Sequence, residues 1–109
     1  MSANTQDLAG KTYVVTGANS GIGFEAAKDF ASRGATTIIV CRSATRGQEA
    51  KESLMQLTGN QHVHLYLADF SLMASVSKVA EEILTDFPVI NVLCNNAGGA
   101  NVTRQLTTE

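Results

Sequence analysis

The sequence is poor in charge, cysteine and proline, and it contains no tryptophan. Only 17% of its 109 residues are charged, against about 25% in an average soluble domain. Eight Lys and Arg against ten Asp and Glu give a formal net charge of −2, so no positive surplus is present to bind a nucleic-acid backbone. Two cysteines are too few for a disulfide framework and are typical of a protein from a reducing compartment.

Long hydrophobic runs are also missing. No apolar segment approaches the roughly 18 residues that cross a bilayer, and residues 1–7 are too polar for a signal peptide. We therefore expect a cytoplasmic protein without a membrane segment. Hydrophobic residues make up 44% of the chain, which excludes disorder. The length is sufficient for one hydrophobic core but not for a second domain.

The hydrophobic pattern changes repeatedly between the period of a strand and that of a helix. Crossover helices therefore join successive strands, and such alternation predicts an α/β fold with a parallel sheet and helices on both faces. Residues 98–109 show no strong period, so we expect the sheet to be truncated after the fourth strand. The predicted strands lie at residues 13–16, 36–41, 62–68 and 90–94.

Each predicted helix carries an apolar stripe that we expect to face the sheet. Ser71 is expected to cap the third helix at its N-terminus, and Pro88 to end it. Gly34 and Gly59 follow the first two helices, where glycine is favoured. The predicted stripes are Ile22, Ala26 and Phe30; Ala50, Leu54 and Leu57; and Leu72, Val76, Val79, Ala80, Ile83 and Phe87.

A glycine-rich turn, TGANSGIG at residues 16–23, joins the first strand to the first helix. Gly17 permits a sharp turn, Gly21 lets the backbone approach a pyrophosphate, and Gly23 lets the helix pack closely on the sheet. The free N–H groups of the helix N-terminus favour an anion. At a strand-to-helix junction this pattern predicts a dinucleotide site. The alternative is a glycine-rich turn without a ligand.

The turn resembles the cofactor loop of the short-chain dehydrogenases/reductases, and two further motifs agree. In residues 67–70, LADF, the resemblance places Asp69 beside the adenine, and residues 95–98, NNAG, match a motif that supports the sheet and contacts the cofactor. The resemblance covers about residues 8–109 and is strongest to the retinol-dehydrogenase-like branch, which includes the WW-domain oxidoreductase. It implies that residues 1–109 are the N-terminal part of a single NAD(P)-binding Rossmann domain with strand order 3-2-1-4.

The end of the second predicted strand indicates which cofactor binds. Enzymes that use NAD usually place an acid there, whereas this chain has Cys41 and no Asp or Glu in residues 34–48. Arg42 and Arg46 follow, and a guanidinium can bind a 2′-phosphate through two hydrogen bonds. In the family that this chain resembles, arginine just after the acidic position goes with NADP. We therefore expect NADP(H) to be preferred over NAD(H).

Two observations bear on that expectation. Ser20 stands where some NADP enzymes carry a basic residue, and the two arginines could instead be solvated residues at a helix start. The complete set of expected cofactor-binding residues is Gly17, Asn19, Ser20, Gly21, Ile22, Gly23, Arg42, Arg46, Asp69, Phe70, Asn96, Ala97 and Gly98.

The remaining histidines and cysteines are expected to be structural. His62 and His64 share one face of a strand but have no evident third ligand, so we expect no metal site. With strand order 3-2-1-4, Cys41 and Cys94 lie about two strand spacings, roughly 9 to 10 Å, apart. A disulfide requires Cα atoms within about 7 Å, so both thiols should be free. Asp69 is an adenine contact or a helix cap rather than a general base.

The resemblance also shows what is missing. The family uses a tyrosine acid/base with a lysine four residues later, but Gly17 follows Tyr13 and Phe70 follows Tyr66 at that spacing. No catalytic residue is therefore expected in residues 1–109. A small-molecule substrate and a homo-oligomer are expected only for a full-length form, because the family's substrate loop and dimer helices would follow Glu109.

Two functions remain open. The chain is either the cofactor-binding portion of an NADP(H)-dependent oxidoreductase acting on an alcohol/carbonyl pair, or a non-catalytic dinucleotide-binding or partner-binding module. An unpaired fourth strand would leave an aggregation-prone sheet edge, and this expectation favours the first function.

Overall fold

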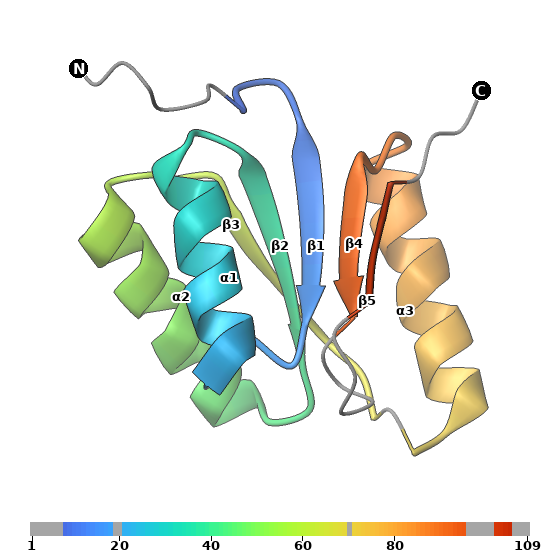
Figure 1. Cartoon of the computed structure of the whole chain (residues 1–109). Helices are drawn as coiled ribbons and strands as arrows, with labels where there is room; N and C mark the ends of the chain where they lie inside the picture. The colour runs from blue at the N-terminus through green and yellow to red at the C-terminus, as the bar shows by residue number, and fades with distance from the viewer. Residues whose placement is uncertain (1–7, 19–20, 70, 96–101, 106–109) are drawn as a thin grey trace.

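The computed structural model describes residues 8–18, 21–69, 71–95 and 102–105. Five strands form one sheet in the order β3-β2-β1-β4-β5, and β1 to β4 are parallel (Figure 1). The α/β architecture and the order 3-2-1-4 are confirmed. The elements in chain order are β1 (Thr12–Thr16), α1 (Gly21–Ser32), β2 (Thr36–Cys41), α2 (Ala44–Thr58), β3 (Val63–Leu67), α3 (Met73–Asp86), β4 (Val92–Asn95) and β5 (Val102–Gln105).

The strand β5 was not predicted. Its backbone pairs antiparallel with β4 over four residues, from Val92 opposite Gln105 to Asn95 opposite Val102. The expectation of a sheet truncated after the fourth strand, with β4 as its edge, was therefore wrong in that detail. Four residues are too short for a hydrophobic period to develop, so the pairing with β4 rather than the local sequence defines this strand.

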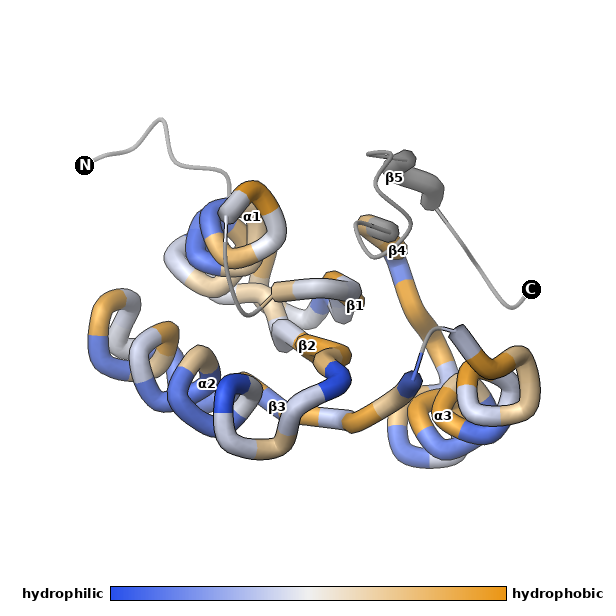
Figure 2. The backbone as a smooth tube through the Cα atoms, turned by 90° about the horizontal axis from the view of Figure 1, so that it is seen from below, coloured by the Kyte–Doolittle hydropathy of each residue, from blue (hydrophilic) through white to orange (hydrophobic). Residues whose placement is uncertain are grey.

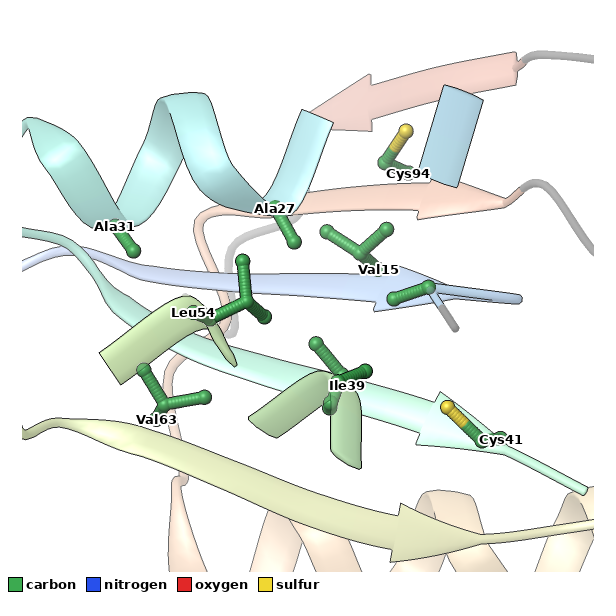
Figure 3. Close-up of a cluster of buried hydrophobic side chains, with 10 residues drawn as sticks. Val15, Ala27, Ala31, Ile39, Cys41, Leu54, Val63 and Cys94 are labelled. Carbon is green, nitrogen blue, oxygen red and sulfur yellow. The ribbon is translucent and has the colours of Figure 1, made fainter. Parts of the chain in front are cut away.

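Helices cover both faces of the sheet, as expected. Figure 2 shows α1 and α2 together on one side and α3 on the other. Successive side chains of a strand point to opposite faces, so neighbouring residues of β1 and β2 belong to two different cores. Val15 and Ile39 pack in the core under α1 and α2, which Figure 3 shows in close-up. Val14 and Ile38 pack in the core that includes residues of α3.

The helix stripes are only partly as predicted. In α1 the buried residues are Gly23, Ala27 and Ala31, and Ala26 and Phe30 of the predicted stripe are partly buried against the same core, while Ile22 is 65% exposed. Small residues let the helix backbone approach the sheet, and this close packing sets the rotation of the helix. In α2, Leu54 is buried as predicted but Leu57 is 64% exposed. The buried α2 stripe begins one turn earlier than predicted, at Gly47.

The third helix begins at Met73, and Leu72 occupies its N-cap position without a side-chain hydrogen bond. The prediction that Ser71 caps this helix was therefore wrong. Val79 and Ile83 are buried as predicted, whereas Leu72 is 56% exposed because it precedes the helix rather than facing the sheet. Ala80 is also exposed. Among the described residues, no helix is long and apolar enough to cross a membrane.

Candidate functional site

The predicted site residues follow the carboxyl ends of parallel strands. These ends meet at one edge of the sheet, at the lower end in Figure 1. β1 lies between β2 and β4, so the chain order reverses there. Ligands of open α/β sheets bind outside the carboxyl ends at such a reversal. The fold therefore brings Gly17, Arg42 and Asp69, each located just after a strand, to the same edge.

The glycine-rich turn has the backbone that its sequence predicts. Gly17 has φ +65°, and its N–H donates to the carbonyl oxygen of Val40 at 2.9 Å, which ties the turn to β2. Gly21 has φ +61° at the first residue of α1, and a Cβ added there would meet no atom within 4 Å. Both positions are left-handed and favour glycine. The open space at Gly21 is what a close ligand approach requires.

The other described residues of the glycine-rich turn are also compatible with a ligand at the start of α1. Gly23 is buried where α1 packs, whereas Ile22 is turned away from the protein and lies at the N-terminus of α1. The first N–H groups of a helix have no partner within the helix and carry its positive dipole end. Asn19 and Ser20 lie outside the described residues.

Both predicted arginines are exposed near this edge. Arg42 directly follows β2, and Arg46 lies in the first turn of α2. The backbone N–H of Arg46 donates to the hydroxyl oxygen of Ser43 at 3.2 Å, so Ser43 caps the helix that carries Arg46. Cys41, at the position where NAD enzymes usually have an acid, is buried in the α1–α2 core. The accessible charge after β2 is thus positive.

Asp69 lies two residues beyond β3, in a turn that its own side chain stabilises. The hydroxyl of Ser71 donates to Asp69 Oδ1 at 2.6 Å, and the backbone N–H of Ser71 donates to the same oxygen at 3.0 Å. These two bonds, and more weakly the charge of Arg42, hold the pKa of the Asp69 carboxyl below its usual range. A carboxylate with a lowered pKa is a poor general base near neutral pH.

Ser71 and Ser75 were missed as members of this site. The hydroxyl oxygen of Ser75, in the first turn of α3, accepts a hydrogen bond from the backbone N–H of Asp69 at 2.9 Å. The spacing Asp-x-Ser is a common side-chain turn and could have indicated the Ser71 contact. Phe70, Asn96, Ala97 and Gly98 lie outside the described part of the chain, although β4 ends at Asn95, immediately before the last three of them.

The two cysteines are buried, and the two histidines lie at the start of β3, away from its carboxyl end. Cys41 and Cys94 are free thiols, as predicted, and burial raises the pKa of Cys41. The ring of His64 packs against Phe87 with centroids 5.0 Å apart, while His62 precedes β3 and is exposed. Within the described residues, no group of three His, Cys, Asp or Glu could hold a metal ion.

A family model and two curated relatives that match this chain all describe dehydrogenases or reductases. Residues 11–109 match the family model described as short chain dehydrogenase. Dehydrogenase/reductase SDR family member 12 from Bos taurus is 41% identical over 102 residues, which are 94% of this chain and 32% of that protein. Retinol dehydrogenase 11 from Homo sapiens is 41% identical over 95 residues, or 87% of this chain and 30% of that protein.

A solved structure agrees with these relatives. L-sorbose reductase from Gluconobacter frateurii, crystallised with NADPH and L-sorbose, superposes with a TM-score of 0.77 at 35% identity. The match covers 86% of this chain and 35% of the reductase. This chain therefore spans about a third of the length of these three proteins.

Proposed function

Because the chain belongs to the short-chain dehydrogenase family, we propose that residues 1–109 are the cofactor-binding portion of an NADP(H)-dependent oxidoreductase acting on an alcohol/carbonyl pair. The expected family and its retinol-dehydrogenase-like branch are confirmed by the relatives. The alcohol/carbonyl reaction is proposed rather than shown, because the chain spans only about a third of the length of those relatives.

The residues at the carboxyl edge fit the parts of a dinucleotide. The open space at Gly21 and the first N–H groups of α1, which have no partner within the helix, suit a pyrophosphate. The exposed guanidinium groups of Arg42 and Arg46 suit a 2′-phosphate, and the Asp69 carboxylate suits a hydrogen-bond donor on adenine. When bound, the cofactor supplies or accepts the hydride. We further propose that Asn19, Ser20, Phe70 and residues 96–98 contact the cofactor, as the family motifs imply.

The observation that carries the choice of NADP(H) is the position of Arg42. It is exposed immediately after β2, and no Asp or Glu occurs in residues 34–48. An acid at this position would hydrogen-bond the ribose of NAD and repel a 2′-phosphate, whereas a guanidinium binds the phosphate. Arg42 also acts electrostatically on Asp69, so the two side chains belong to one region of the edge.

The substitution Arg42→Asp tests this proposal. Affinities of the 109-residue chain for 2′,5′-ADP and 5′-AMP are measured by titration calorimetry, because these ligands differ only in the 2′-phosphate. We expect the chain to prefer 2′,5′-ADP and the variant to prefer 5′-AMP. Losing a hydrogen bond to a charged group costs about 1.5–3 kcal/mol, which is roughly a 10- to 100-fold loss of affinity for 2′,5′-ADP.

Two further variants separate charge from geometry. Arg42→Lys keeps the charge but loses the paired donors, so it should retain the preference for 2′,5′-ADP at a reduced ratio. Arg33→Gln, at the end of α1 away from the glycine-rich turn, removes one positive charge and should leave the ratio unchanged. An unchanged ratio in Arg42→Asp would refute the role of Arg42.

A non-catalytic nucleotide-binding or partner-binding module remains the second candidate. Neither Tyr13 nor Tyr66 has a lysine four residues later, and the hydroxyl of Tyr66 is bonded to Asp86. Residues 1–109 therefore do not supply the family's proton-transfer pair under either function. Binding of the cofactor is common to an enzyme portion and to a nucleotide-binding module.

A further inference from the structure

Asp69 is held by four hydrogen bonds with the residues that follow it. Its backbone N–H donates to Ser75 Oγ at 2.9 Å, and its carbonyl oxygen accepts from the N–H of Leu72 at 3.0 Å. Its Oδ1 accepts from the N–H and from the hydroxyl of Ser71, at 3.0 and 2.6 Å. Both the backbone and the carboxylate of Asp69 are thus oriented by the turn between β3 and α3.

Both donors of Ser71 are directed to the same carboxylate oxygen. Within the part of the chain that the structure describes, no hydrogen bond reaches Oδ2 of Asp69. An ionised carboxylate has about four acceptor positions, two on each oxygen. Oδ2 therefore keeps its acceptor capacity while Oδ1 fixes the orientation of the group. The hydroxyl of Ser71 is not needed for capping, because Leu72 is the N-cap residue of α3.

We propose that Ser71 is a positioning residue, which orients the Asp69 carboxylate so that Oδ2 accepts a hydrogen bond from the amino group of adenine and selects adenine over hypoxanthine. This inference rests on the proposed function, in which Asp69 lies beside the adenine. Adenine carries a donor at that position, whereas hypoxanthine carries a carbonyl oxygen that a carboxylate repels. Without the Ser71 hydroxyl, the backbone N–H of residue 71 alone would hold Oδ1, so the exposed carboxylate would have more rotational freedom to lose on binding.

The electrostatics of the turn agree with this role. The hydrogen bonds from Ser71 and the charge of Arg42 keep the pKa of the Asp69 carboxyl low. The group is therefore ionised near neutral pH, and an ionised carboxylate can only accept hydrogen bonds. It is thus suited to the adenine amino group and unsuited to the carbonyl oxygen of hypoxanthine.

The test compares two ligands and four forms of the chain. Affinities for NADP⁺ and for its hypoxanthine analogue are measured by titration calorimetry with the wild-type chain, Ser71→Ala, Ser71→Thr and Ser32→Ala. We expect the wild type to prefer the adenine form about tenfold, equivalent to roughly one hydrogen bond of ordinary strength. In Ser71→Ala the preference should fall at least threefold, mainly through weaker binding of NADP⁺.

The other two variants are controls. Ser71→Thr keeps the hydroxyl and should restore the preference. Ser32→Ala removes a hydroxyl that bonds the carbonyl oxygen of Lys28 in α1, and it should leave the preference unchanged. Ser71 is exposed, so Ser71→Ala should unfold at the same temperature as the wild type. A change in base preference without a change in stability is not expected from a merely structural residue.

The possible failures can be told apart. Wild type that binds NADP⁺ with no preference for adenine, or an unchanged preference in Ser71→Ala, overturns the inference and leaves the proposed function intact. Wild type that binds neither dinucleotide overturns both. Loss of the preference in Ser71→Ala with recovery in Ser71→Thr establishes the positioning role.

Discussion

Among single residues, Tyr66 makes a contact that joins two elements outside the candidate site. Its hydroxyl donates a hydrogen bond to a carboxylate oxygen of Asp86, in the last turn of α3. Burial of the ring, and then the bond to Asp86 and its negative charge, raise the pKa of Tyr66 to about 12. The phenol must stay protonated to donate, so this contact links the edge strand β3 to α3 only while Tyr66 is neutral.

The raised pKa predicts how stability depends on alkaline pH. A tyrosine in the unfolded chain has a pKa of about 10, so the folded state holds its proton more tightly. The stabilisation by Tyr66 is then fully present below pH 10 and is lost as the pH rises towards about 12. Unfolding free energies of the wild type and of Tyr66→Phe, measured by urea denaturation from pH 9 to 11.5, should converge as the pH increases.

An ultraviolet titration provides the control for this prediction. The phenolate absorbance of the wild type minus that of Tyr66→Phe reports Tyr66 alone, and its midpoint should lie near 12. Asp86→Asn removes the neighbouring negative charge and should move the midpoint downwards. A midpoint near 10 in the wild type would contradict the contact.

Among the elements, α2 is held in place by hydrogen bonds at both of its ends. Ser43 caps its N-terminus, and Gly59 ends it at φ +75° with its N–H donating to the carbonyl oxygen of Met55 at 2.9 Å. The side chain of Asn60, just beyond, donates to the carbonyl oxygens of Ala31 and Ala35 at 3.1 and 2.8 Å. The end of α2 is thereby tied to the end of α1 and the start of β2.

The two leucines of α2 offer a matched pair of substitutions. Leu54 is fully buried, whereas Leu57 is 64% exposed. Leu54→Ala should lower the free energy of unfolding by about 2–5 kcal/mol, because it removes buried methyl groups and leaves a cavity. Leu57→Ala on the same helix should change it by less than about 0.5 kcal/mol.

Chemical denaturation followed by circular dichroism measures both values. Equal losses in the two variants would mean that α2 packs on the sheet with a different rotation from the one described. The stripe that the sequence predicts, with Leu57 facing the sheet, would then be correct.

At the scale of the whole molecule, the sheet separates two cores that are filled from opposite faces. The core under α1 and α2 contains both cysteines, on β2 and β4, on either side of β1 (Figure 3). Neither thiol can be reached without opening this core, since both side chains are buried. Burial also raises the pKa of Cys41, which reduces its reactive thiolate form.

Thiol labelling should therefore report unfolding of the whole domain. Cys41 and Cys94 should react slowly with a disulfide reagent in the native chain, and both should become reactive at the urea concentration at which the circular dichroism signal is lost. Leu57→Cys provides an exposed thiol on the same fold and should react at once. Rapid reaction of either natural cysteine without denaturant would show that this core opens locally.

Much of the architecture could be predicted because its signals are local. The alternation of periods, the glycine-rich turn and the positions of Arg42 and Asp69 after β2 and β3 are properties of short segments. They determine a parallel sheet and bring the candidate residues to its carboxyl edge, because parallel strands end on the same side. The family follows from motifs in residues 11–109 for the same reason.

Three features depend on packing or on residues distant in the sequence, and only the tertiary structure decided them: which residues of α1 are buried, the strand β5 and the contact of Ser71. The full burial of Gly23, Ala27 and Ala31 could not be predicted, because their close approach to the sheet outweighs burial of the larger Ile22, while Ala26 and Phe30 are partly buried beside them. The strand β5 exists through its pairing with β4. Ser71 had the residue type of a cap, but its hydroxyl is directed to Asp69 because the helix starts two residues later. The sequence by itself determined which chemical groups follow each strand, and the tertiary structure decided which of those groups orient one another.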